Sequence, residues 1–173
     1  MKLFSSSLAL ATVLAAAAHA GAPEPTKPVD LHRFMGRWYE ILRTPNRHER
    51  DCSAPYEDWS SNGGADIQVT IVCHRGAPDG PLKIVKTTTR VLNPPHNTKY
   101  ESKIFGLLVV GRYWVVDHAP DYGWMIATTE DGRFPALLSR RPSLADGQGE
   151  ALKGRMTQLG FDVTRLEASS GGS

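Results

Sequence analysis

Three arginines and two carboxylates are concentrated between Arg43 and Asp51, and this segment has the clearest binding chemistry in the 173-residue chain. Arg43, Arg47 and Arg50 are three or four residues apart. A guanidinium donates paired hydrogen bonds to a carboxylate or a phosphate, so the segment could bind an anionic group. A group of arginines also attracts an anionic membrane surface, so a transient membrane contact is a second interpretation. The third is a solvated loop that pairs its own charges.

Signatures of enzyme chemistry are scarce in the sequence. It contains no Gly-x-Ser-x-Gly, His-Glu-x-x-His or phosphate-binding loop motif. The histidines lack metal-ligand spacing, so we predict neither a metal site nor a cofactor. A formal net charge of +2 gives no reason to expect a nucleic-acid partner.

The first 20 residues have the organisation of a secretory signal peptide. Lys2 precedes an apolar run that begins at Leu8, and Ala18-His19-Ala20 is a typical cleavage site. The run is too short and too rich in alanine for a membrane anchor, which needs about 20 strongly apolar residues. No cysteine occupies the cleavage position, so no lipid anchor is expected. We therefore predict a periplasmic or secreted protein.

Cys52 and Cys73 are the two cysteines of the chain. An even number of cysteines in an exported protein favours a disulfide. Closing the loop between them would stabilise the fold by roughly 3 kcal/mol. The alternative is two free thiols, of which one could be reactive.

Eight short runs have the character of β-strands, separated by turn residues such as Asn62-Gly63-Gly64. Their spacing predicts an all-β fold, an eight-stranded antiparallel up-and-down β-barrel. The runs are Gly36 to Arg43, Ala54 to Ser60, Asp66 to His74, Leu82 to Leu92, Thr98 to Phe105, Gly111 to His118, Tyr122 to Thr129 and Phe134 to Arg140.

One helical pattern follows the strands, from Ser143 to Leu159, and it is expected to pack on the outside of the barrel. Its apolar stripe consists of Leu144, Leu152, Met156 and Leu159. Ser143 and Asp146 resemble a capping box, and Gly160 is well placed to end the helix. A last strand is predicted over Phe161 to Leu166. The domain is expected to span residues 30–167, with a loose lead-in at 21–29 and a disordered tail at 168–173.

With these elements in place, the chain resembles the lipocalin family, and most closely its bacterial and apolipoprotein D-like group. The first family motif corresponds to Gly36-Arg37-Trp38-Tyr39-Glu40, and Leu138-Ser139-Arg140-Arg141-Pro142 corresponds to the closing motif. The charged segment Arg47-His48-Glu49-Arg50 is similar to the first loop of bacterial members, which arches over the open mouth of the barrel. Cys52 and Cys73 resemble a pair that joins the second and third strands in some exported members.

The resemblance implies a structural role for Gly36, Trp38 and Arg140. The guanidinium is expected to lie over the indole at the closed end, in a cation–π contact worth about 0.5–2 kcal/mol. It should also bond backbone carbonyls there. Neither side chain is expected to touch a ligand.

Strand alternation predicts which side chains face the interior. If Trp38 faces inward, Glu40 must be paired or protonated, because a lone buried charge is costly. Arg140 or a tyrosine hydroxyl could satisfy it. The predicted cavity-lining residues are Glu40, Leu42, Tyr56, Tyr113, Val115, Phe134, Ala136 and Leu138.

The function implied by the resemblance is binding of a small hydrophobic ligand, such as a fatty acid or a lysophospholipid, for lipid transport or scavenging in the envelope. Arg43, Arg47 and Arg50 are the predicted headgroup contacts at the mouth. We do not expect an enzyme. The alternative is a small hydrolase or isomerase on the same barrel, with an unpaired Cys52 or an isolated Glu40. A third possibility is a protein-binding module whose barrel is filled by its own side chains.

Overall fold

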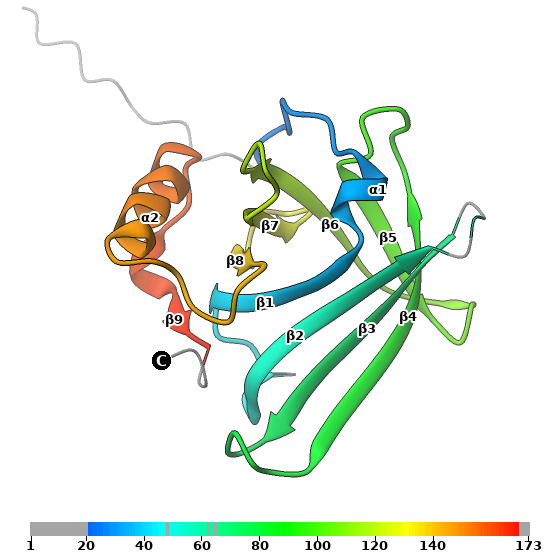
Figure 1. Ribbon diagram of the computed structural model, residues 1–173. Coiled ribbons are helices and arrows are strands. Elements are labelled where there is room, and N and C mark those ends of the chain that lie inside the picture. Colours follow the sequence, from blue (N-terminus) through cyan, green and yellow to red (C-terminus); the bar gives the residue numbers. More distant parts are fainter. Residues whose placement is uncertain (1–20, 48, 62, 64–65, 170–173) are drawn as a thin grey trace, which may run out of the picture.

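A computed structural model describes residues 21–47, 49–61, 63 and 66–169 (Figure 1). The predicted signal peptide lies outside these residues, as do His48 of the first loop, two residues of the predicted Asn62-Gly63-Gly64 turn and residues 170–173 of the predicted tail.

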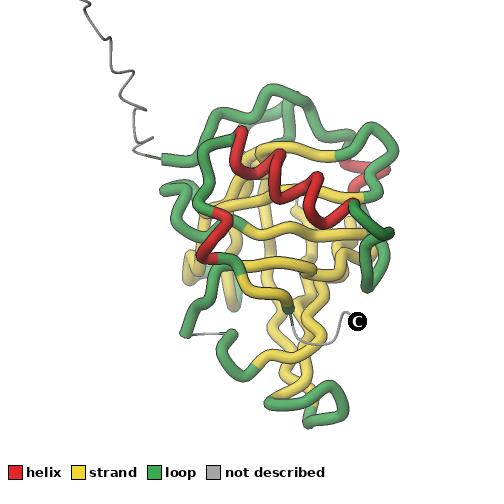
Figure 2. The backbone as a smooth tube through the Cα atoms, turned by 90° about the vertical axis from the view of Figure 1, so that its left-hand side faces the viewer, coloured by secondary structure: helices red, strands yellow, loops and turns green. Residues whose placement is uncertain are grey.

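Eight antiparallel strands form a closed barrel, as predicted (Figures 1 and 2). The first strand pairs with both the second and the eighth, and this double pairing closes the sheet. The strand ends differ from the predictions by a few residues, because the turns begin and end with residues that also suit a strand. The strands are β1 (Gly36–Arg43), β2 (Cys52–Ser61), β3 (Asp66–Arg75), β4 (Leu82–Val91), β5 (Lys99–Ile104), β6 (Leu108–His118), β7 (Trp124–Thr129) and β8 (Ala136–Ser139).

A helix near the C-terminus, α2 (Gln148–Gln158), lies across the outside of the barrel, as predicted (Figure 2). Leu152 and Met156 are buried against an outer apolar cluster that includes residues of β6, β7 and β8. Gly160 ends the helix as expected: its φ is +90°, and the Phe161 N–H reaches back to the Met156 carbonyl. This hydrogen bond is characteristic of a Schellman motif at the end of a helix.

The predicted beginning of this helix is wrong. The helix begins after Gly147, whose φ of +74° is left-handed, and no side chain caps it. Ser143 and Asp146 therefore do not form the predicted capping box. Glycine adopts this left-handed conformation without a steric penalty. The chain therefore turns at Gly147, and the helix starts later than the apolar pattern suggests.

The predicted strand Phe161 to Leu166 is also wrong. Phe161 packs into the outer cluster, and Val163–Arg165 forms a short 3-10 helix (η1) whose first turn is capped by Asp162. The strand comes later, as β9 (Glu167–Ala168), and pairs with the end of β1.

Residues of the predicted lead-in make packed contacts, and so does Ser169, one of the two described residues of the predicted tail. Val29 is buried, and the Lys27 ammonium lies 2.6 Å from the buried Asp117 carboxylate. Arg155 of α2 binds the other oxygen of Asp117, also at 2.6 Å. Ser169 is buried too, and its N–H donates to the Ile41 carbonyl. These described residues are therefore held in place by partners that are distant in the sequence.

One end of the barrel is closed by aromatic side chains and a short helix, α1 (Leu31–Phe34). Trp38 is fully buried there, and the Arg140 guanidinium lies 3.7 Å from the centroid of its ring, as predicted. Arg140 also donates to the carbonyls of Arg33, Phe34 and Arg37 at 2.8–2.9 Å. A single side chain thus joins the end of β8 to α1 and to the start of β1.

Replacing Arg140 with lysine should lower the free energy of unfolding by about 1–3 kcal/mol, because an ammonium cannot reach three carbonyls and lie flat on an indole. Urea unfolding measures the change. Arg141→Lys is the matched control, since Arg141 is exposed, and it should change stability by less than about 0.5 kcal/mol. Equal effects of both substitutions would show that Arg140 does not hold the closed end together.

Candidate functional site

The barrel contains a cavity of about 500 Å³, within the range of small-molecule binding sites. Most of its wall is apolar and comes from β3, β6, β7 and β8. This cavity does not support the third possibility, a barrel filled by its own side chains. The main apolar lining residues are Val69, Ile71, Val110, Tyr113, Met125, Ala127, Phe134, Ala136 and Leu138.

Several predicted cavity residues line this space. Tyr113 reaches it from β6, while Phe134, Ala136 and Leu138 reach it from β8 and the turn before it. Val115 lies in the inner cluster of buried residues, but it is not part of the cavity wall described for this chain. We attribute its place to strand alternation, which carries Val115 one step closer to the closed end than Tyr113.

Leu42 does not face the cavity. The pairing of β1 with β8 shifts register between Glu40 and Leu42, which is a β-bulge at Ile41. Ile41 and Leu42 both pack into the outer cluster beneath α2. The bulge also turns Arg43 back toward the interior, where it lines the cavity.

Tyr56 also lies outside the cavity. Its ring is tilted against that of Tyr39 on the outer surface, and the Arg37 guanidinium lies 4.0 Å from its ring centroid. Its neighbour Glu57 faces the cavity instead. The sequence signal for this was available, because Glu57 has the same strand parity as Trp59, which lies in the inner core.

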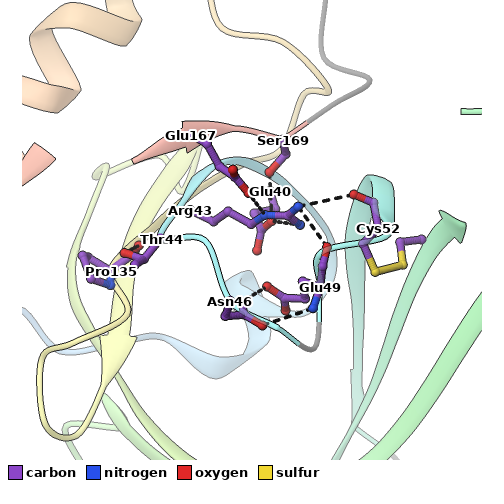
Figure 3. Close-up of polar contacts among 10 residues, drawn as sticks. Glu40, Arg43, Thr44, Asn46, Glu49, Cys52, Pro135, Glu167 and Ser169 are labelled. Atoms are coloured by element: carbon purple, nitrogen blue, oxygen red, sulfur yellow. Dashed lines mark hydrogen bonds and ion pairs between the residues drawn. A yellow bond between two sulfur atoms is a disulfide. The ribbon is translucent and has the colours of Figure 1, made fainter. Parts of the chain in front are cut away.

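Arg43 is the centre of a polar group at the mouth (Figure 3). Its Nε donates to Glu167 at 3.0 Å, and its Nη1 donates to Glu40 at 3.3 Å. Its Nη2 donates to the carbonyls of Glu49 and Cys52. Because the guanidinium is buried and bonded to protein groups, it positions the first loop.

The other two predicted headgroup arginines, Arg47 and Arg50, are exposed. Neither is among the cavity-lining residues of the described chain, in which Arg43 is the one arginine. Of the three predicted headgroup contacts at the mouth, the structure thus places Arg43 in the cavity wall, while a contact of Arg47 or Arg50 with a headgroup stays a prediction.

Three carboxyl groups line the cavity, those of Glu40, Glu49 and Glu57. Burial raises the pKa of Glu57 to about 6, although its carboxylate accepts a hydrogen bond from the Trp59 indole at 2.9 Å. Burial and the nearby Glu49 raise the pKa of Glu40 to about 8. Glu40 is held by Arg43 and by the Ser169 hydroxyl at 2.8 Å, and not by Arg140 or a tyrosine as predicted.

The predicted disulfide is present between Cys52 and Cys73, and it joins β2 to β3 near the mouth. It removes the free thiol that an enzyme with a Cys52 nucleophile would need. Within the described residues, no group of three or more His, Cys, Asp or Glu side chains could hold a metal ion. No helix in the same part of the chain is long and apolar enough to cross a membrane.

Glu57→Gln should flatten the pH dependence of stability between about pH 4.5 and pH 6. The folded-state pKa of Glu57 lies above its unfolded value, so burying this group costs least when it is protonated at low pH. Stability is then lost as the pH rises through 6, by about 2 kcal/mol for a shift of this size. Urea unfolding across this range measures the slope, and Glu150→Gln on the exposed face of α2 should leave it unchanged. A slope that is the same in all three proteins would contradict the assignment.

Comparison with known proteins identifies the family. A sequence model of the lipocalin-like domain matches residues 29–170. The chain is 26% identical to apolipoprotein D of Mus musculus over 159 residues, which cover 82% of this chain and 79% of that protein. It is also 26% identical to the outer membrane lipoprotein Blc of Vibrio cholerae over 152 residues, 84% of this chain and 86% of that protein.

Solved structures agree with this assignment at the level of the fold. Insecticyanin from the tobacco hornworm Manduca sexta superposes with a TM-score of 0.66 at 19% identity, covering 84% of this chain and 82% of that one. Lobster apocrustacyanin A1 superposes with a TM-score of 0.62 at 16% identity, covering 90% of this chain and 93% of that one. The closed barrel, the Trp38–Arg140 contact and the matching domain model lead to one conclusion: the chain belongs to the lipocalin family, in the group of apolipoprotein D and Blc.

Proposed function

We propose that the protein binds a single-chain amphipathic lipid, such as a fatty acid or a lysophospholipid, and carries or stores it in the barrel cavity. The observation that carries this proposal is an apolar cavity of about 500 Å³ above a closed aromatic floor. Removing an acyl chain from water into such a space is favourable by about 25 cal/mol per Å² of apolar surface. Membership of the lipocalin family, whose members bind small hydrophobic ligands, supports the proposal.

The polar groups at the mouth favour some headgroups over others. Three carboxyl groups face the cavity, and the one guanidinium among its described lining residues already has protein partners. Where these groups are ionised, a free carboxylate would therefore meet like charges, whereas a zwitterionic or uncharged head would not. We place lysophospholipids ahead of fatty acids for this reason.

The place of action that we propose is the periplasm or the extracellular space, and the task is lipid transport or scavenging there. The disulfide supports this proposal, because such bonds persist in oxidising compartments. The predicted signal peptide supports it as well. One relative is named an outer membrane lipoprotein, which is consistent with a role in the cell envelope.

The alternative of an enzyme on the same barrel has little support. It relied on an unpaired Cys52 or an isolated Glu40. Cys52 is bonded to Cys73, and Glu40 is held by Arg43 and Ser169. A binding protein uses the cavity without any reacting group.

Filling the cavity should abolish lipid binding. Ala127 lies on β7 in the cavity wall, so Ala127→Trp should weaken binding of a fluorescent lysophospholipid by at least about tenfold. Ala151→Trp is the matched control, because Ala151 is exposed on α2. Fluorescence titration measures both, and circular dichroism checks that each variant is folded. Native protein that fails to bind any single-chain lipid would refute the proposed function.

The carboxyl groups should make fatty-acid binding depend on pH. Glu57 becomes charged as the pH rises through about 6 and Glu40 as it rises through about 8. Dodecanoate affinity should therefore fall by roughly tenfold between pH 6 and pH 9. A lysophosphatidylcholine with the same acyl chain keeps its zwitterionic head over this range, and its affinity should change little. Calorimetric titration measures both affinities. If they changed equally with pH, the carboxyl groups at the mouth would not discriminate between the two headgroups.

A further inference from the structure

The connection between β5 and β6 exposes an unusual amount of apolar surface. Seven consecutive residues without a polar side chain, Ile104 to Val110, form its tip, which we call the apolar hairpin. Phe105 is 93% exposed and Leu107 is 87% exposed, and the next three residues are exposed or half-exposed. A contiguous apolar patch of this kind on a folded protein marks an interaction site.

The backbone of this tip is strained in a way that its sequence does not relieve. Phe105 has a φ of +53° and Gly106 a φ of +70°, and the Leu107 N–H bonds back to the Ile104 carbonyl. Asn or Gly occupies the first of two such left-handed positions at little cost, whereas a bulky aromatic residue is rare there. Phe105 is thus both exposed and strained. It does not stabilise the fold, which favours a role in binding.

The apolar hairpin lies at the entrance of the cavity. In an up-and-down barrel, the β5–β6 connection is at the same end as the first loop and the β7–β8 connection (Figure 1). Val110, at the base of the hairpin, is half-exposed and lines the cavity. Phe134, from the β7–β8 connection, is 40% exposed and lines it as well. Apolar side chains therefore mark the passage from solvent into the binding site.

Cations lie behind the tip on the outer surface. Arg90, Lys103 and Arg112 come from β4, β5 and β6 and surround the one carboxylate of Glu101, at 3.0–3.7 Å. Glu101 is nearly inaccessible, whereas Arg90 and Arg112 remain about half-exposed. An apolar tip above half-exposed cations complements the surface of a bilayer, in which an apolar interior lies beneath anionic headgroups.

We propose that the apolar hairpin inserts into the surface of a phospholipid bilayer that contains anionic lipids, with Arg90, Lys103 and Arg112 at the level of the headgroups. A second copy of this chain fits the tip poorly, because a narrow turn offers far less than the roughly 800 Å² per partner of a stable dimer. In this position the cavity mouth faces the source of a single-chain lipid. This loading route, though not the docking itself, depends on the proposed function.

The test uses co-sedimentation of the full mature protein with vesicles of phosphatidylethanolamine and phosphatidylglycerol. The native protein should pellet with the vesicles, and higher salt should weaken the binding through screening of the cations. The double variant Phe105→Asn/Leu107→Ser should lower the partition coefficient by at least about tenfold. Asparagine tolerates the left-handed conformation at Phe105, so this variant should fold at least as well as the native protein.

The control is Leu92→Ser, since Leu92 is 37% exposed in the β4–β5 connection at the opposite end of the barrel. It should pellet like the native protein. Vesicle binding that is absent in the native protein, or equal in the double variant, would overturn the proposal. So would a native dimer, measured by light scattering, that the double variant dissociates. Lysophospholipid binding without vesicles, measured on the same samples, tests the proposed function separately and should be equal in the native protein and the double variant.

Discussion

The contact between Arg140 and the closed end of the barrel is the constraint on which the rest of the structure depends. One guanidinium covers the buried indole of Trp38 and satisfies three carbonyls from α1 and the start of β1. An α-helix of one turn leaves its carbonyls without partners of its own, so this external donor replaces the hydrogen bonds that a longer helix would supply. With the floor fixed, the strands above it can enclose a space that they do not fill.

The apolar side chains are divided between two separate layers. An inner cluster around Phe34, Trp38 and Trp59 packs at the floor, while an outer cluster lies between the barrel wall and α2. The cavity lies above the floor and shares part of its wall with the inner cluster, since Val69, Met125 and Leu138 belong to both. This arrangement explains how a domain of this size keeps an empty volume and still has two packed cores. The mouth is held differently, by the hydrogen bonds of Arg43 and by the disulfide.

Much of this architecture could be predicted from the sequence, and the exceptions have local causes. The alternation of apolar residues and the turn residues were sufficient to predict the eight strands. The motifs that contain Trp38 and Arg140 were sufficient to predict how the closed end is held. The bulge at Ile41 could not be foreseen, because alternation assumes an unbroken register, and one extra residue exchanges Leu42 for Arg43 at the cavity. Ser169 was missed for another reason: its partner, Glu40, is 129 residues away, and no local pattern reports such a contact.

The separation of the aromatic floor from the cavity wall has a consequence for how such proteins diverge. Substitutions near the mouth, at residues such as Val110 and Phe134, change what fits inside and leave the aromatic side chains of the floor untouched. A lineage can therefore alter its cargo without first acquiring compensating mutations elsewhere. Barrels that share less than a fifth of their residues with this one, such as those of insecticyanin and apocrustacyanin, still superpose on it over most of their length. The aromatic floor and the rim of the cavity are thus different parts of one small domain that can change separately.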